Sequence, residues 1–262
     1  MAKIHPSAIV DPKAQLDSTV EIGAFTIIGP HVSIDAGTVV GPHVVIEGHT
    51  TIGKDNKFFQ FSSIGAAPQD KKWSGEPTRL EVGDRNTVRE FCTFNTGTVQ
   101  DKGVTRLGHD NWISAYVHLA HDCQVGNNTI FSNNAQLAGH VEVGDWAILS
   151  GYAGVHQFCK IGAHAFIGMY TSLTQDVPPF VLVSGNPAGA RGVNIEGMKR
   201  RGFTRPQIDA IRSAYKTIYR NSLTLEEAKA VLEKDMAESS EAAGPVKDML
   251  AFLGAATRGI VR

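Results

Sequence analysis

The stretch of sequence that decides the fold runs from residue 107 to residue 173 and reads LGHDNWISAYVHLAHDCQVGNNTIFSNNAQLAGHVEVGDWAILSGYAGVHQFCKIGAHAFIGMYTSL. A bulky apolar residue stands at every sixth position of this stretch. These positions are Leu107, Ile113, Leu119, Val125, Phe131, Leu137, Val143, Leu149, Val155, Ile161, Ile167 and Leu173. A period of six fits neither an α-helix, with about 3.6 residues per turn, nor a strand that simply alternates. It fits a prism with three flat faces, in which each hexapeptide supplies one short strand and one corner.

The same period extends towards the N-terminus. It runs from Ile4 to Ile64, resumes at positions 82, 88 and 94, and shifts by one residue before Leu107. Three hexapeptides form one coil, and coils stack at about 4.8 Å so that together they enclose one core. Glycine often follows the apolar residue, as at Gly23 and Gly83, and we interpret it as the residue that lets the corner turn. Residues 1–190 are therefore predicted to form a parallel β-helix of hexapeptide repeats in a mainly β protein.

Two polar segments and the C-terminal region depart from the repeat. Residues 66–78 and 95–106 are rich in Gly, Pro and charge, and are predicted to be loops at corners of the prism. They are either tolerated insertions or loops that carry binding residues on a rigid scaffold. From about Val193 the apolar residues recur at helical spacing, and Thr224 with Glu227 forms a predicted capping box. Residues 191–262 are therefore predicted to form a C-terminal α-helical domain.

The composition argues against several kinds of protein. A formal net charge of −1 and a sequence pI of about 6.8 give no general attraction for nucleic acid or for an anionic membrane. The sequence has no apolar run of membrane-spanning length and no apolar signal-peptide core, so we expect a cytoplasmic protein without an integral membrane segment. The three cysteines include no CxxC pair and are interpreted as packing residues, not as a disulfide framework or a Cys-rich zinc site.

Four of the ten histidines lie close together in the second run of repeats. They are His118, His121, His140 and His156. A coil of three hexapeptides stacks His121, Gly139 and Gln157 on one edge of the prism. It stacks Asp122 and His140 directly beside them. The spacing therefore predicts that His121, His140 and Asp122 meet.

This cluster has a catalytic interpretation and two competing ones. A histidine beside a carboxylate is the usual arrangement of a general base, and a glycine one coil away can offer its backbone N–H to an oxyanion. A single corner histidine more often decorates a turn, but the clustering favours a catalytic site. A zinc site would need imidazoles that converge on one point, and nothing in the spacing forces three of them to do so.

Several longer motifs carry a resemblance to a known family. They are QFSSIG at 60–65, GEPTRLEVGDRN at 75–86, HLAHDC at 118–123, NNAQLAGHVEV at 133–143, VHQFCKIGAH at 155–164, QDVPPF at 175–180 and NIEGMKRRGF at 194–203. From the first coil to the C-terminal GIVR, the sequence resembles the acyl-carrier-protein-dependent UDP-N-acetylglucosamine O-acyltransferases. The resemblance implies a left-handed coil, an exception to the right-handed crossover rule, and a homotrimer. It also implies the first step of lipid A biosynthesis.

The family resemblance implies a direct acyl transfer. His121 would remove the proton from the sugar 3-hydroxyl, and that oxygen would attack the thioester of a (R)-3-hydroxyacyl chain on acyl carrier protein. Asp122 would orient His121 or balance its charge, and the N–H of Gly139 would stabilise the oxyanion. The acyl group would arrive on the phosphopantetheine of the carrier protein, so neither another cofactor nor a metal is implied.

The resemblance also implies which residues bind substrate. Asp70 and Lys72 would reach the substrate of a neighbouring subunit. Sugar and acyl groups would be held by His118, His140, His156 and Gln157, and the nucleotide by Asn194, Glu196, Arg200 and Arg201. The two arginines suit a diphosphate, although without the resemblance residues 199–201 would be interpreted as a solvated helix end. Arg212, Lys216 and Arg220 form a helical stripe that is either an ordinary exposed face or a docking surface for the acidic carrier protein.

Two positions depart from the family pattern. Thr96 stands where many members carry Arg, so a contact of that Arg is lost or replaced. Met169 stands where the family sets acyl length by the size of one residue. A glycine there would leave room for a longer chain, whereas Met would close the end of the groove. The sequence therefore predicts a preference for a 3-hydroxyacyl chain roughly two to four carbons shorter, at about 1–3 kcal/mol per methylene.

Three other functions compete with this one. The first is the related N-acyltransferase that acts on a UDP-3-O-acyl-glucosamine, which typically carries an extra N-terminal domain, whereas here the repeats begin at Ile4. The second is a metal-dependent hydratase of the carbonic anhydrase type. The third is a scaffold without catalysis, which the predicted stack of His121, Asp122 and Gly139 disfavours.

Overall fold

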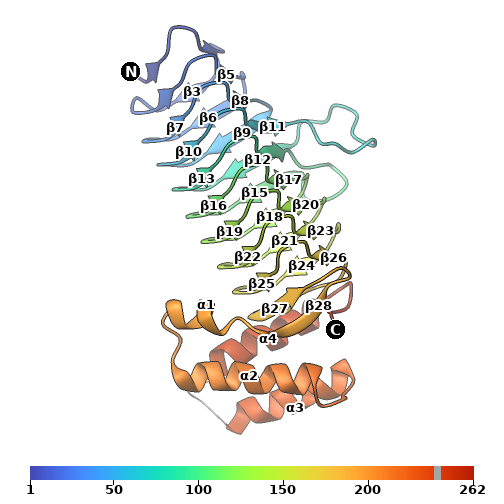
Figure 1. Cartoon of the computed structure of the whole chain (residues 1–262). Helices are drawn as coiled ribbons and strands as arrows, with labels where there is room; N and C mark the ends of the chain where they lie inside the picture. Colours follow the sequence, from blue (N-terminus) through green and yellow to red (C-terminus); the bar gives the residue numbers. More distant parts are fainter. Residues whose placement is uncertain (239–242) are drawn as a thin grey trace.

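Three parallel β-sheets form the faces of a long prism. The computed structural model describes residues 1–238 and 243–262, with coils stacked along one axis and four helices at the C-terminal end of the stack (Figure 1). Each coil contributes one strand to each sheet, so strands β1, β4 and β7 are neighbours in one sheet. The structure confirms the predicted left-handed parallel β-helix that is followed by α-helices.

The strands are short, and we name the sheets A, B and C. Sheet A contains β1 (Lys3–Ile4), β4 (Glu21–Ile22), β7 (Val39–Val40), β10 (Lys57–Phe58), β13 (Thr87–Val88), β16 (Trp112–Ile113), β19 (Ile130–Phe131), β22 (Ile148–Leu149), β25 (Phe166–Ile167), β27 (Val181–Ser184) and β28 (Gly189–Val193). Sheet B contains β2 (Ile9–Val10), β5 (Ile27–Ile28), β8 (Val45–Ile46), β11 (Ser63–Ala66), β14 (Thr93–Asn95), β17 (His118–Leu119), β20 (Gln136–Leu137), β23 (Gly154–Val155) and β26 (Ser172–Leu173). Sheet C contains β3 (Gln15–Leu16), β6 (Val32–Ile34), β9 (His49–Ile52), β12 (Arg79–Val82), β15 (Val104–Leu107), β18 (Gln124–Val125), β21 (Glu142–Val143) and β24 (Lys160–Ile161).

The apolar repeat positions form the core of the prism. Every one of them between Leu107 and Leu173 is at most 4% exposed. Burying one such side chain contributes about 1.5–3 kcal/mol relative to leaving it in water. The first coil differs, because no coil lies beneath it: Ile4 is 43% exposed, and Val10 and Leu16 are only half-buried.

Most corners of the prism turn through residues other than glycine. Tyr116, Asp122 and Trp146 occupy corners in the left-handed region, with φ values of 65°, 61° and 63°. Gly23 and Gly83 do not adopt this conformation. A Cβ on either glycine would lie 2.6 Å from backbone of the next coil. The interpretation of these glycines as the turning residues was therefore wrong, because they serve instead to let the coils approach closely.

Two loops leave the prism at the same edge. The first spans residues 67–78 between β11 and β12, and the second spans residues 96–103 between β14 and β15 (Figure 1). The predicted loops, 66–78 and 95–106, thus include a few strand residues. Both loops lie between a strand of sheet B and the next strand of sheet C. We call this the B–C edge.

Helices α1 (Ile195–Arg200), α2 (Arg205–Tyr219), α3 (Leu225–Glu238) and α4 (Ala243–Ala255) follow the last strands. The predicted boundary between residues 190 and 191 falls inside β28, which pairs with β27 in antiparallel orientation. The predicted capping box forms at the start of α3, where the N–H of Glu227 donates to Oγ1 of Thr224 at 3.2 Å and the N–H of Thr224 donates to Oε2 of Glu227 at 2.8 Å. Among the residues that the structure describes, no helix combines the length and the apolar character needed to cross a membrane.

Asp176 joins the C-terminal tail to the last coil. Its carboxylate is fully buried and accepts the backbone N–H groups of Lys160 at 2.8 Å, Thr257 at 2.9 Å and Arg258 at 3.2 Å. The backbone of Asp176 also pairs with that of Ile260. One side chain therefore holds the tail against the end of the prism.

Replacing Asp176 by Ala should loosen this end of the molecule. Three N–H groups lose their acceptor, so we expect the free energy of unfolding to fall by about 3 kcal/mol and the Tm to fall by about 6–12 °C. Thermal denaturation measures the change. Asp17→Ala is the control, because Asp17 is an exposed carboxylate on the first coil that accepts the N–H of Thr19, and it should cost no more than about 0.5 kcal/mol. An unchanged Tm in Asp176→Ala would contradict this account.

Candidate active site

The histidine cluster lies on the B–C edge, just beyond the second loop. Strand β17 runs into this edge and β18 leaves it, and β20 and β21 repeat the path one coil later. β17 pairs with β20 so that His118 is opposite Gln136. The N–H of His140 donates to the carbonyl of His121 at 3.0 Å. The predicted meeting of residues from these two coils is therefore confirmed.

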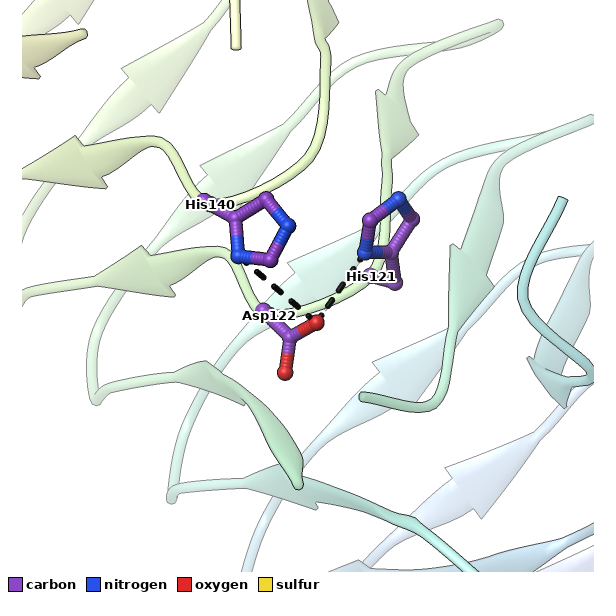
Figure 2. A group of neighbouring side chains, drawn as sticks. All are labelled: His121, Asp122 and His140. Atoms are coloured by element: carbon purple, nitrogen blue, oxygen red, sulfur yellow. Dashed lines mark hydrogen bonds and ion pairs between the residues drawn. The ribbon is translucent and has the colours of Figure 1, made fainter. Parts of the chain in front are cut away.

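A carboxylate joins the two imidazoles of the cluster. Figure 2 shows Nδ1 of His121 and Nδ1 of His140 directed at the same oxygen of Asp122, Oδ2, at 3.0 Å and 3.8 Å. The two rings lie edge to face, with centroids 4.9 Å apart. The shorter contact is a hydrogen bond, so His121 and Asp122 form a dyad.

The second loop holds the dyad carboxylate in place. Asp122 is fully buried, and the backbone N–H and the hydroxyl of Thr98 donate to its carboxylate at 3.0 Å and 2.6 Å. Its own N–H donates to Oγ1 of Thr105 at 2.8 Å. Burial favours the neutral acid, but the hydrogen bonds from His121 and Thr98 outweigh it and hold the pKa of Asp122 below its usual value.

An ionised Asp122 has two consequences. Its contribution to stability is complete above the ordinary pKa of 3.8 and is lost as the pH falls through the lower folded-state value. It also accepts the proton on Nδ1 of His121, which assigns the neutral tautomer in which Nε2 has a free lone pair. His121 is therefore set to accept a proton at Nε2.

Gly139 lies directly against the His121 ring. A Cβ at this position would lie 2.5 Å from Cε1 and 2.7 Å from Nε2 of His121. Only glycine therefore leaves the ring in place. The backbone hydrogen bonds of the described residues do not include the N–H of Gly139, so this donor remains available next to Nε2.

A groove of about 820 Å³ begins beside the dyad and follows sheet B across several coils. Its lining includes His118, Gln136, Tyr152, His156, Tyr170 and Asn186. Burial lowers the pKa of His118, and a protonated His121 would lower it further, while a hydrogen bond with the backbone of Thr93 opposes that shift. Nδ1 of His118 also lies 2.7 Å from Oγ1 of Thr93. His118 and His156 thus line the same groove. Gln157 is exposed, and its carbonyl lies 3.2 Å from Nδ1 of His156.

The cysteines do not offer a nucleophile. Cys92, Cys123 and Cys159 are buried, and burial raises their thiol pKa values to about 12, about 12 and about 11. The prediction that they are packing residues is confirmed. None of the three thiols is therefore set up as a nucleophile beside the dyad.

The same three side chains can be tested as a metal site. His121, Asp122 and His140 offer ligand atoms within 4.8 Å of one another. Oδ2 of Asp122, however, already accepts hydrogen bonds from His121 and from both the N–H and the hydroxyl of Thr98. A metal on that oxygen would displace these donors, so the arrangement fits a hydrogen-bonded dyad better.

Comparison with known proteins places the chain in a family. Residues 176–261 match the family described as Udp N-acetylglucosamine O-acyltransferase, Domain 2, and residues 105–139 match that of the bacterial transferase hexapeptide, six repeats. A protein of Herminiimonas arsenicoxydans named acyl-[acyl-carrier-protein]--UDP-N-acetylglucosamine O-acyltransferase is 62% identical over 262 residues, which is all of both chains. This chain belongs to that acyltransferase family.

Further relatives agree with this assignment. A protein of the same name from Thiobacillus denitrificans is 61% identical over 262 residues, again the whole of both chains. The solved structure of LpxA from Acinetobacter baumannii has a TM-score of 0.95 and 45% identity, and the match covers 99% of each chain. The chain is thus an O-acyltransferase with a hexapeptide-repeat β-helix.

In this acyltransferase the predicted substrate residues of the first loop stand apart from the dyad. Asp70 is half-buried and Lys72 is exposed in the first loop, where Oδ1 of Asp70 accepts the N–H of Lys72 at 3.0 Å. No hydrogen bond within the described residues joins either of them to the dyad. Thr96 is buried and bonds to Thr78 at 3.2 Å between the hydroxyls, so it ties the ends of the two loops together.

The residues expected to bind the nucleotide lie on another edge of the prism. Asn194 caps α1 and donates from Nδ2 to the carbonyl of His164 at 3.0 Å. Nη1 of Arg201 lies 3.2 Å from Nδ1 of His164, and its guanidinium lies over Trp146. Burial and the charge of Arg201 lower the pKa of His164 to about 4, so His164 is neutral and accepts from Arg201. Trp146 and His164 mark the corner between sheets C and A.

The remaining predicted residues are on the surface. Arg200 is exposed, and Glu196 is exposed with an ion pair to Lys199 at 2.9 Å. Arg212 and Lys216 are exposed on α2, and Arg220 is exposed at the C-cap of that helix. Met169 is 63% exposed beside Tyr170, which lines the groove.

Three residues of the site were missed by reasoning from sequence. Thr98 and Thr105 hold Asp122, and Asp101 of the second loop lies 2.7 Å from Nδ1 of His140. Thr98 and Asp101 lie in the loop that interrupts the repeat, and Thr105 follows it in β15, so spacing gave no signal for these side chains.

Gly139→Ala should displace the His121 ring without disturbing the coil. We expect kcat/KM for acyl transfer to fall roughly 100-fold, because a catalytic group shifted by about 1 Å loses that much. Steady-state kinetics and thermal denaturation of the same preparations measure the effect. Gly151→Ala is the matched control, since it occupies the same repeat slot and its Cβ would meet atoms only at 3.4 Å and beyond. Equal activity of the two variants would show that His121 does not need this glycine.

Proposed function

We propose that this enzyme transfers a (R)-3-hydroxyacyl chain from acyl carrier protein to the 3-hydroxyl of UDP-N-acetylglucosamine. The observation that carries the proposal is the buried Asp122 carboxylate, which fixes the tautomer of His121 in a full-length member of this acyltransferase family. We further propose that this reaction is the first step of lipid A biosynthesis. The names of the relatives support the substrates.

The reaction proceeds by direct attack. Nε2 of His121 takes the proton of the sugar 3-hydroxyl while that oxygen attacks the thioester carbonyl. The N–H of Gly139 donates to the oxyanion of the tetrahedral intermediate. The intermediate then collapses, the C–S bond breaks, and the proton on His121 passes to the departing phosphopantetheine thiolate. Asp122 stabilises the imidazolium between these steps. The acyl group arrives on the carrier protein, so we propose that neither a metal nor another cofactor is required.

We propose that the functional unit is a homotrimer. The dyad lies on the B–C edge, whereas Asn194 and Arg201 lie on the edge between sheets C and A. A substrate that contacts both sets is best accommodated where the two edges of different subunits face each other, with Asp70 and Lys72 reaching across. Exposed apolar side chains such as Trp112 on sheet A support such packing. A monomeric mass in analytical ultracentrifugation would overturn this part.

Sugar and acyl groups are assigned to the groove. His118 and His156, which line the groove, would contact them together with His140 and Gln157. Glu196, Arg200 and Arg201 would contact the nucleotide of a substrate bound between subunits. We also propose a cytoplasmic location, in keeping with three cysteines that are free and buried.

Replacing His121 by Ala should lower kcat by about 10²–10⁴-fold, the usual contribution of a general base. The assay follows acyl transfer to UDP-N-acetylglucosamine from a panel of 3-hydroxyacyl carrier proteins. His31→Ala is the control, because His31 lies on the same edge of the prism and stacks on His49, away from the dyad. Full activity of His121→Ala would sink the proposed base.

Measurements on the wild-type enzyme also distinguish the competing functions. Absence of transfer with every acyl chain would favour the relative that acylates an amine. Stoichiometric bound zinc, measured by elemental analysis, would favour the metal-dependent hydratase, which the 4.8 Å grouping of His121, Asp122 and His140 keeps as the second candidate.

Met169 is proposed as the residue that limits acyl length. Met169→Gly should shift the preferred chain by roughly two to four carbons towards longer ones, because each methylene is worth about 1–3 kcal/mol in an apolar site. Competition assays with mixed acyl carrier proteins measure the ratio. Met169→Leu, which conserves volume, is the control. An unchanged preference in Met169→Gly would remove Met169 from this role.

Arg212, Lys216 and Arg220 are proposed to attract the acidic carrier protein. Reversing Arg212 and Arg220 to Glu should raise KM for the acyl carrier about tenfold at low salt, with less effect at high salt. KM for the sugar nucleotide should stay the same. Arg205→Glu serves as control, because Arg205 is on the same helix and 93% exposed at its side chain. Equal effects of both changes would contradict a specific docking stripe.

A further inference from the structure

The second loop is fastened to the coils of the active site at three points. Thr98 donates to the Asp122 carboxylate, Oδ2 of Asp101 lies 2.7 Å from Nδ1 of His140, and Nζ of Lys102 lies 2.8 Å from Oε1 of Glu142. The first contact serves the dyad. The second reaches a histidine that the catalytic step does not use.

His140 is closely confined on three sides. Its side chain is 11% exposed, its ring stacks on Phe158 at 4.2 Å with 5° between the planes, and His121 lies edge-on to it at 4.9 Å. The charged groups that face it are Asp101 and Asp122, and His121 is the third titratable neighbour. Stacking fixes the plane of an imidazole, but it does not decide which ring edge carries Nδ1, because the terminal torsion of histidine is roughly two-fold.

Among the described residues, Asp101 is the one neighbour placed to determine which ring edge of His140 carries Nδ1. Asp122 is 3.8 Å from Nδ1 of His140 and already accepts from His121 and Thr98. Asp101 is within hydrogen-bond distance and accepts from Nδ1. The hydrogen bonds of the described residues do not include Nε2 of His140, and that nitrogen lies on the side of the ring turned towards His121 (Figure 2).

We propose that Asp101 is a positioning residue that fixes the ring direction and the tautomer of His140, and so presents Nε2 of His140 to the substrate beside His121. This inference rests on the proposed function, in which His140 holds a sugar or acyl group. The bond from Nδ1–H to Asp101 leaves Nε2 as the substrate-facing atom. A carboxylate behind a binding imidazole orients it in the same way as carboxylates behind metal-bound histidines do.

Three variants distinguish a role of Asp101 in positioning His140 from a role in holding the second loop closed. Asp101→Ala removes the acceptor, Asp101→Asn keeps an oxygen that can accept Nδ1–H, and Lys102→Met releases the neighbouring fastening to Glu142 without touching His140. We expect Asp101→Ala to raise KM for UDP-N-acetylglucosamine roughly 10–100-fold, the usual effect of losing such a partner. We expect KM to stay close to the wild-type value in Asp101→Asn and to change little in Lys102→Met.

A spectroscopic measurement tests the same claim without catalysis. In ¹⁵N-histidine-labelled enzyme, His140→Gln identifies the His140 signals, and Nδ1 of His140 should be protonated in the wild type and in Asp101→Asn. In Asp101→Ala the two tautomers should mix. Unchanged tautomer and KM in Asp101→Ala, or an equal rise of KM in Lys102→Met, would overturn the proposal. If the wild type does not acylate UDP-N-acetylglucosamine at all, the proposed function fails, whereas the tautomer still decides the role of Asp101.

Discussion

Closure of each coil after three hexapeptides is the constraint on which the rest of this structure depends. The coil closes because every sixth residue turns inward and because each strand pairs with its counterpart in the next coil throughout the regular part of the prism. Stacking in parallel register leaves no freedom to slip, since a shift of one residue would turn the buried side chains outward. Residues of successive coils are thereby held side by side although they are far apart in sequence. His121 meets His140 and Gly139 for this reason.

The loops add what regular coils cannot provide. The second loop does not disturb the register of sheet C, because Glu81 of β12 still pairs with Arg106 of β15. The extra residues, 96–103, lie over the B–C edge. A corner carboxylate in an uninterrupted coil is open to water, as Asp55 is. Thr98 instead covers Asp122 and donates to it twice, which keeps the carboxylate ionised although it is buried. The rigid prism therefore supplies position, and the loop supplies the environment.

The sequence alone predicted those parts of the site that obey the period. The meeting of His121, Gly139, Asp122 and His140 follows from the spacing, and it was predicted correctly for that reason. Thr98 and Asp101 do not follow from it, because a loop has no register and its side chains can be placed only by the fold.

Other features needed the three-dimensional packing or the family resemblance. The glycines after the apolar positions were misinterpreted, because a sequence does not distinguish a turn from close contact between coils. Asn194 and Arg201 lie on a different edge from the dyad, so their role in one substrate site depends on subunits that one chain does not contain.

The central claim is that Asp122 acts through His121 as one unit. A double-mutant cycle with His121→Ala, Asp122→Asn and the double variant tests it most directly, with kcat for acyl transfer to UDP-N-acetylglucosamine as the readout. Residues that act as a unit give losses that do not add, so the double variant should be no slower than His121→Ala alone. If instead the two losses multiply, Asp122 contributes independently of His121 and the dyad mechanism is contradicted.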